Sequence, residues 1–148
     1  MPVDVETETE IARPRDEVAA YACDPDNATA WYEKIQAVSW ETPPPLTVGS
    51  RVAFGASFLG RRLSYTYEIV ELVPGERLVM RTIEGPFPME TTYSFTDAGD
   101  GGTRMTLRNR GEPSGFAKVG APVMAAAMRR ANRKDLAALR AVLEGLGR

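Results

Sequence analysis

The chain has 148 residues, of which 43% are hydrophobic and 26% charged, and its 18 basic and 20 acidic side chains give a formal net charge of -2. We expect a single domain over residues 1–148, because this length leaves little room for a second core and the apolar content is too high for a disordered chain. The charge balance argues against a nucleic-acid partner held through its phosphates.

Histidine is absent from the sequence, and Cys23 is the only cysteine. This composition excludes Ser-His-Asp and Cys-His nucleophiles, histidine general bases and the usual zinc sites. No phosphate-binding loop is recognisable either, so we expect no metal and no cofactor. A lone thiol cannot form an internal disulfide, which favours a cytoplasmic location, and no segment approaches the roughly 20 apolar residues that a membrane span needs.

The chain begins with strand and helix signals in turn. Residues 3–11 alternate between apolar or threonine side chains and acidic ones, which predicts a half-buried strand with an acidic outer face. Pro14 and the acids that follow it indicate a short helix that ends near Cys23. After an Asp-Pro break, Asn27 or Thr29 is in position to cap a second short helix.

The middle of the chain is strand-like. Turns rich in proline and glycine separate six segments, which predicts an antiparallel meander. The segments lie at about 35–41, 50–59, 61–72, 77–85, 89–97 and 103–110.

Helical spacing of apolar residues then predicts one long helix from about residue 114 to residue 146. Pro122 indicates that the regular helix begins near that residue or kinks there. The whole pattern predicts an α+β fold in which a curved, seven-stranded antiparallel sheet wraps around the long C-terminal helix, with two short helices after the first strand. Where sheet and helix diverge, we expect a cavity on the order of a few hundred Å³.

Alternation within the strands places one set of side chains on the face toward the long helix. This set includes three tyrosines, whose phenol groups suit an aromatic or sterol-like ligand, although ordinary strand aromatics with hydroxyls at the sheet rim are the alternative. Two methionines on the helix suit the lining of a cavity, or are plain core. The candidate ligand-binding residues are Tyr65, Tyr67, Tyr93, Asn109, Phe54, Phe58, Met80, Met124, Met128 and Asn132.

Two amides in this set need partners. Asn109 and Asn132 fall on predicted apolar faces, where an unpaired amide costs about 1–3 kcal/mol. A bridging water or a backbone group is the simplest partner, and a ligand is the alternative.

Two features lie away from this face. The loop at residues 85–89 carries two prolines, and the sequence predicts that its Phe87 and Met89 form an exposed apolar tip, which suits an entrance; a hairpin stiffened by proline is the alternative. Arg81 and Glu90, on neighbouring predicted strands, are in position to pair across the outer face as structural charges. Basic side chains decorate the C-terminal helix, which indicates a solvent face, with an acidic partner as the alternative.

Several segments carry a resemblance to a known family: residues 11–14, the Asp24-Pro25 break followed by Trp31, residues 67–78 and the hairpin at 100–107. With the final helix they resemble the START-like, Bet v 1-like superfamily (SRPBCC), in particular its polyketide cyclase/dehydrase and lipid-transport branch. The resemblance covers essentially the whole chain and implies the helix-grip fold. In this family the short helices form a wall near the cavity opening, which implies a place for Trp31 at the entrance beside Phe87 and Met89; anchoring those helices to the sheet is the structural alternative for Trp31.

The known functions of this superfamily range from lipid and hormone binding to polyketide ring closure and protein-partner roles. We therefore consider three functions, in this order: binding of a hydrophobic small molecule such as a lipid, polyketide or aromatic metabolite; a cyclase/dehydrase enzyme acting in the same cavity; and a protein-partner module. Without histidine, the enzyme would rely on its tyrosines and asparagines, and no catalytic residue can be named from the sequence.

Overall fold

The computed structural model describes residues 3–58, 60–85, 87–112 and 120–146, apart from the side chains of Phe58, Ala121 and Leu146. Its elements follow in the order β1 (Val3–Ile11), α1 (Arg15–Ala22), α2 (Ala28–Trp31), β2 (Ile35–Trp40), β3 (Arg51–Phe58), β4 (Arg61–Val73), β5 (Arg77–Glu84), β6 (Met89–Asp97), β7 (Thr103–Gly111) and α3 (Ala121–Leu146). Short 3-10 turns lie at Pro25–Asn27 and Gly99–Gly101.

The predicted order of elements is confirmed, and the strand limits agree within about a residue. The long helix begins at Ala121, one residue before Pro122, where a missing backbone N–H costs no helical hydrogen bond. The part of the predicted helix at residues 113–119 lies outside the described residues. Asn27 is the residue before α2, as expected, but its side-chain oxygen makes no capping hydrogen bond, and its side-chain nitrogen donates to the Tyr21 carbonyl.

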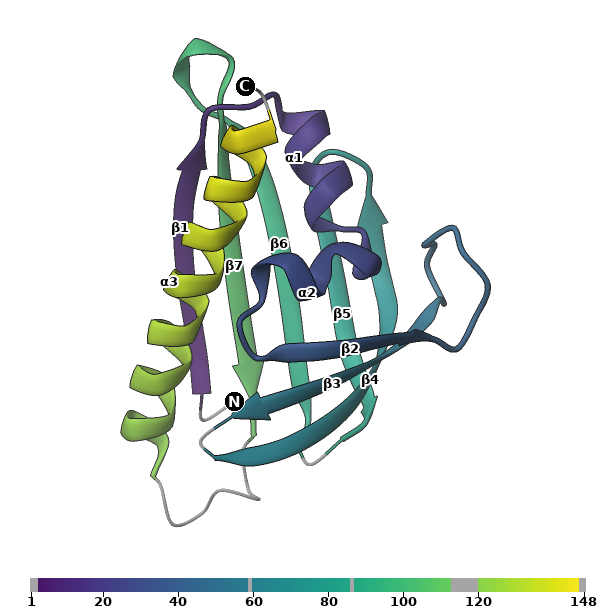
Figure 1. The fold of residues 1–148 in the computed structure, drawn as a ribbon. Helices are drawn as coiled ribbons and strands as arrows, with labels where there is room; N and C mark the ends of the chain where they lie inside the picture. The colour runs from purple at the N-terminus through teal and green to yellow at the C-terminus, as the bar shows by residue number, and fades with distance from the viewer. Residues whose placement is uncertain (1–2, 59, 86, 113–119, 147–148) are drawn as a thin grey trace.

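The seven strands form one antiparallel sheet in the order β1-β7-β6-β5-β4-β3-β2. Successive strands from β2 to β7 are neighbours, and β1 closes the order by pairing with β7. Figure 1 shows α3 running along β1 and β7, whereas α1 and α2 lie over the middle of the sheet and β2 and β3 curve across its lower end. The helices therefore cover a single face of the sheet.

Alternate residues of the strands build the core on the covered face. Val3, Val5 and Leu107 of the paired strands β1 and β7 are fully buried, as are Leu139 and Leu143 of α3. This packing follows from the two periods, two in the strands and three to four in the helix, that the sequence displays.

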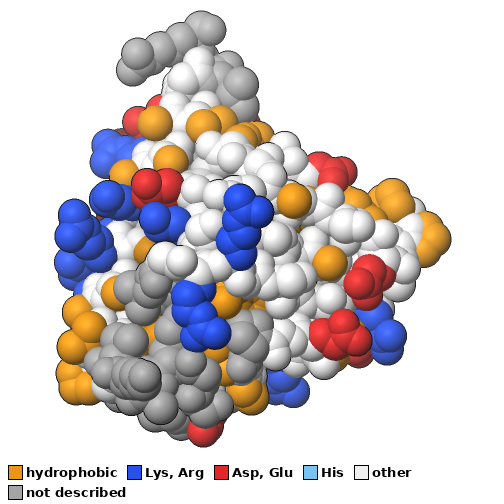
Figure 2. Space-filling model, turned by 60° about the horizontal axis from the view of Figure 1, so that its bottom comes forward, with side chains coloured by type: hydrophobic (Ala, Val, Ile, Leu, Met, Phe, Trp, Pro, Cys, Tyr) orange, Lys and Arg blue, Asp and Glu red, His pale blue; other side chains and the backbone are white. Residues whose placement is uncertain are grey.

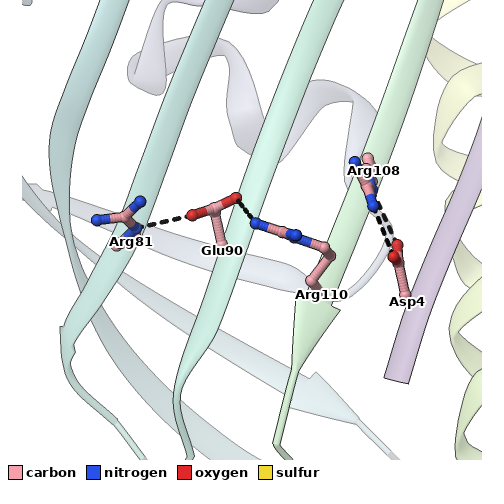
Figure 3. A network of polar contacts seen from close by, with 5 residues as sticks. All are labelled: Asp4, Arg81, Glu90, Arg108 and Arg110. Carbon is pink, nitrogen blue, oxygen red and sulfur yellow. Dashed lines mark hydrogen bonds and ion pairs between the residues drawn. The ribbon is translucent and has the colours of Figure 1, made fainter. Parts of the chain in front are cut away.

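Charges occupy the opposite, outer face of the sheet. The acids of β1 meet arginines of β7 across the strand pair, with Asp4 accepting two hydrogen bonds from Arg108 at 2.9 and 2.6 Å. Figure 3 shows Glu90 of β6 between Arg81 of β5 and Arg110 of β7. Both contacts are short, 2.7 Å from Arg81 Nε and 2.6 Å from Arg110 Nη2. The predicted Arg81–Glu90 pair is present, and because Glu90 is only 9% exposed it is more buried than a purely solvated charge.

Basic side chains gather at one edge of the molecule. Figure 2 shows Lys and Arg side chains clustered on the left, the side on which α3 runs in Figure 1. The exposed basic residues of α3 are Arg130, Arg133, Lys134 and Arg140. Among the described residues, no helix combines the length and the apolar character that crossing a membrane requires.

Candidate functional site

A cavity of about 140 Å³ lies between the inner face of the sheet and the helices. Residues from every strand except β1 and from all three helices line it, and most of the lining side chains are aromatic or aliphatic. The cavity is smaller than the few hundred Å³ expected from the sequence, and the rings of Tyr32 and Phe87 form part of its wall. A cavity near 150 Å³ has room for about one benzene ring.

Most of the predicted ligand-binding residues come together here. The predicted alternation of inward and outward side chains holds through the cavity. The β4–β5 pair has two irregularities of register. The extra residue of β4, Val70, comes after the inward tyrosines, and the other extra residue, Ile83, lies in β5. The predicted residues that line the cavity are Phe54, Tyr65, Tyr67, Met80, Phe87, Met89, Tyr93, Asn109, Met128 and Asn132.

Three predicted residues do not contribute to the described lining. Met124 is buried one turn before Met128 but belongs to the core, because the cavity ends before that turn of α3. Trp31 is only 2% exposed and packs on the rings of Tyr32 and Tyr93, which is the anchoring role rather than an entrance. The side chain of Phe58 lies outside the described part of the chain.

The expectation of an exposed tip at Phe87 is wrong. Its side chain is 3% exposed and meets the Tyr65 ring edge to face, with ring centroids 5.9 Å apart. Gly85 lets the loop approach this ring, because a Cβ at Gly85 would lie 2.9 Å from Tyr65 Cδ1. The loop therefore turns Phe87 inward, where burial of a phenyl ring is favourable.

A row of polar groups crosses the cavity from β4 to α3. Thr91 Oγ1 lies 3.5 Å from the Tyr67 hydroxyl and donates to Asn109 Oδ1 at 2.6 Å. Asn109 Nδ2 donates in turn to Asn132 Oδ1 at 3.3 Å. The two asparagines thus satisfy one another in part, but Asn132 Nδ2 is buried without a hydrogen-bond partner among the described residues.

Two tyrosine hydroxyls converge beside this row. The hydroxyl oxygens of Tyr32 and Tyr93 lie 2.6 Å apart, so one donates to the other. Burial raises the pKa of both phenols well above the usual value, and it raises the pKa of Tyr67 to about 12. All three phenols are therefore neutral at physiological pH and act as hydrogen-bonding groups.

Tyr32 and Asp135 line the cavity although the sequence analysis did not name them as site residues, and Asp135 of α3 is the titratable acid of the pair. Its side chain is 3% exposed, lines the cavity and accepts a hydrogen bond from the Glu33 backbone N–H at 3.0 Å. Burial raises the pKa of Asp135 to about 6, against the lowering effect of that hydrogen bond and of Lys34. A signal was present, since Asp135 lies seven residues after Met128 and three after Asn132, on the same face of the helix.

The described residues do not form a metal centre. They contain no group of three or more His, Cys, Asp or Glu side chains placed to hold an ion. Burial raises the pKa of the Cys23 thiol, which also lines the cavity, to about 12, so this cysteine is a neutral wall residue at physiological pH.

Comparisons with known proteins agree with this architecture. The sequence model of a family described as polyketide cyclase / dehydrase and lipid transport matches residues 2–144. A START superfamily protein from Mycobacterium smegmatis is similar in structure with a TM-score of 0.83 and 15% identity, over 97% of this chain and 98% of the other. The Zhui aromatase/cyclase from Streptomyces sp. R1128 has a TM-score of 0.79 and 18% identity, over 98% of this chain and 95% of the other.

A protein from Thermus thermophilus has a TM-score of 0.74 and 19% identity, over 94% of this chain and 98% of the other. No curated protein sequence matches the chain. At these identities the structural likeness establishes the fold, which is the helix-grip α+β arrangement.

Proposed function

The chain belongs to the polyketide cyclase / dehydrase and lipid transport family, and from this premise we propose that it binds a small hydrophobic molecule, with about the bulk of one aromatic ring, in the cavity between the sheet and α3. One observation carries the proposal: a mainly apolar cavity contains a buried amide donor, Asn132 Nδ2, that has no partner within the described chain. Small-molecule sites combine apolar walls with a few fixed polar groups in this way.

The polar groups of the cavity differ in their availability to a ligand. The Tyr32 and Tyr93 hydroxyls share one hydrogen bond, which uses the proton of only one of them, and Asn109 uses both its oxygen and its nitrogen. Asn132 Nδ2 has no described partner and can anchor a ligand oxygen, and the O–H of the phenol that accepts in the Tyr32–Tyr93 bond is not used by that bond. The aromatic walls, with Phe54 and Tyr65 each meeting a neighbouring ring, favour a flat ligand.

A steric block tests the proposal. Met128→Trp should fill the cavity and reduce the affinity for toluene, used as an apolar one-ring probe, by at least about tenfold, at a stability cost of about 1–3 kcal/mol from overpacking. Val123→Trp is the matched control, because Val123 is on the same helix and 59% exposed. Ligand-observed NMR and the toluene-induced rise in melting temperature give the affinities. Equal toluene affinity in the two variants would move the binding site out of this cavity.

Asp135 favours a second candidate function, ring closure of a short polyketone. A carboxylate with a pKa of about 6 exchanges a proton readily near neutral pH. In this scheme Asp135 takes a proton from a carbon between two carbonyl groups, the resulting enolate carbon bonds to a further carbonyl carbon, and that carbonyl oxygen takes up a proton. Subsequent loss of water leaves a carbon–carbon double bond in the new ring.

The enzyme function has its own test. A synthetic 3,5,7-triketo ester, in which C2 can bond to C7 to close a six-membered ring, should give an absorbing cyclic product faster with the protein than without it, and Asp135→Asn should lower kcat by roughly 10²- to 10⁴-fold, the range for general acid–base catalysis. Toluene affinity should stay unchanged in this variant. If the wild-type protein does not accelerate the reaction, ligand binding alone remains as the proposal.

A further inference from the structure

A hydrogen-bond donor and an acceptor lie side by side on the cavity face of α3. Asn132 and Asp135 are three residues apart in the helix, a spacing that makes their side chains neighbours on one face. Both line the cavity, and both are more than nine-tenths buried, with 4% and 3% of each residue exposed. A ligand that occupies the cavity therefore meets both groups.

The donor is the free amide nitrogen of Asn132. Its Oδ1 accepts from Asn109, which fixes the orientation of the amide, whereas Nδ2 has no partner among the described residues. A buried donor without an acceptor is unfavourable. A ligand oxygen that accepts from Nδ2 removes that penalty, so the cavity favours ligands with a carbonyl or hydroxyl oxygen at this point.

The acceptor is the carboxylate of Asp135. One oxygen, Oδ1, accepts from the Glu33 backbone N–H, and no arginine or lysine of the described chain forms an ion pair with the carboxylate. The charged and titratable side chains around it are Glu33 and Lys34, between α2 and β2, and the neutral phenol of Tyr32. With a pKa of about 6, Asp135 is mainly ionised at pH 7.5, so it attracts a ligand O–H or N–H and repels a ligand anion.

The remaining charges of the wall do not offset this repulsion. Among the described lining residues the charged ones are Asp24, Lys34 and Asp135, two acids and one base. Lys34 is exposed to solvent, where its field is screened, whereas Asp135 is buried. A carboxylate ligand would therefore face a buried like charge that forms no ion pair with a cation of the described residues.

We propose that the Asn132–Asp135 pair makes the cavity selective for uncharged ligands that carry a carbonyl acceptor beside an O–H or N–H donor, and that it rejects carboxylates of the same size, such as benzoate. This inference rests on the proposed function, because it names the ligand class of the same cavity. Neutral hydroxyaryl ketones, lactams and primary amides have the required edge, with donor and acceptor adjacent.

Three probes of nearly equal size test the selectivity. Benzamide carries both the acceptor and the donor, acetophenone carries the acceptor alone, and benzoate is the anion. At pH 7.5 the wild-type protein should bind benzamide about 2- to 10-fold more tightly than acetophenone, the range expected for one hydrogen bond. It should bind benzoate at least about tenfold more weakly than benzamide. Titrations followed by ligand-observed NMR give the three affinities.

Two variants assign the effects to the pair. Asp135→Asn removes the charge, so benzoate affinity should rise at least about tenfold. The single oxygen of the new amide stays with the Glu33 N–H, so the 2- to 10-fold preference for benzamide over acetophenone should be lost. Asn132→Leu should weaken the binding of acetophenone and benzamide by about 2- to 10-fold more than it weakens the binding of toluene. Wild-type affinities for benzoate and benzamide that are equal, or benzoate affinity that does not respond to Asp135→Asn, would overturn the inference.

The toluene measurement separates this inference from the proposed function. If toluene binds and Met128→Trp prevents its binding, while the three polar probes show no order, the ligand class is wrong and the cavity function stands. If toluene affinity is the same in Met128→Trp and Val123→Trp, the cavity function itself fails, and the ligand class fails with it.

Discussion

On the outer face of the sheet Glu90 is held by two arginines, whereas on the cavity side Asp135 is buried and no cation of the described residues is bonded to it. The hydrogen bond from Arg81, joined by that from Arg110, keeps the pKa of Glu90 below its usual value despite the opposing effect of burial. Burial raises the pKa of Asp135 to about 6. The pKa values of two largely buried carboxylates in one small protein thus shift in opposite directions. The difference between them is whether a cation is bonded to the carboxylate.

The two faces of the sheet differ in the same way along a single strand. In β7, Arg108 lies outside and binds Asp4, while the next residue, Asn109, lies inside and joins the polar row of the cavity. Outer charges pair across strands and support the register. Inner polar groups are left partly unpaired at a cost in stability, which is typical of a functional site rather than of a core.

The largest expected contrast compares neighbours on opposite faces. Leu107 is fully buried, so Leu107→Ala should lower the free energy of unfolding by about 2–5 kcal/mol through the cavity it leaves. Thr106→Ala, at the neighbouring position on the outer face, should lower the free energy of unfolding by less than about 1 kcal/mol. Urea unfolding at pH 7.5 gives both values. Similar losses in the two variants would contradict the assignment of the faces.

Asp135→Asn should stabilise the protein at pH 7.5 by about 1–3 kcal/mol, since the folded-state pKa of about 6 lies about two units above the ordinary value. The sign follows from proton binding: the contribution of Asp135 is most favourable below pH 4, and it is lost as the pH rises through about 6. The gain of the variant should therefore grow from pH 4 to pH 7 and be absent at pH 4. A gain that is equal at both pH values would show that the carboxylate titrates normally. Unfolding curves at a series of pH values provide the check.

Glu90→Gln should destabilise the protein, in contrast to Asp135→Asn, and by a smaller amount. The free energy of unfolding should fall by about 1–2 kcal/mol at pH 7.5, because the amide no longer offers a charged acceptor to Arg81 and Arg110. The folded-state pKa of Glu90 is lowered, so its contribution is present above the ordinary pKa and disappears as the pH falls through the folded-state value. The difference between variant and wild type should shrink in acid. The same urea series measures it, and a loss that persists unchanged at the lowest pH would rule out the charge as its cause.

The order of elements and the inward face of the sheet were predictable from the sequence. Alternation in β3 to β7 is a local property, and the extra residue of β4, Val70, comes too late in the strand to displace Tyr65 or Tyr67 from the cavity. Pro122 likewise marked the start of α3 through its own missing N–H. The resemblance of the whole chain to its family pointed to the same fold.

The composition of the site depended on tertiary packing. Met124 and Met128 share a face of α3, but the extent of the cavity along the helix decides that only Met128 lines it. The inward turn of Phe87, between β5 and β6, depends on its contact with Tyr65 of β4. The volume of the cavity depends on how far such rings extend into it. Local patterns specify which way a side chain points from its own element, because they follow from backbone geometry. The space between elements, and hence the raised pKa of Asp135, follows from the packing of segments that are distant in sequence.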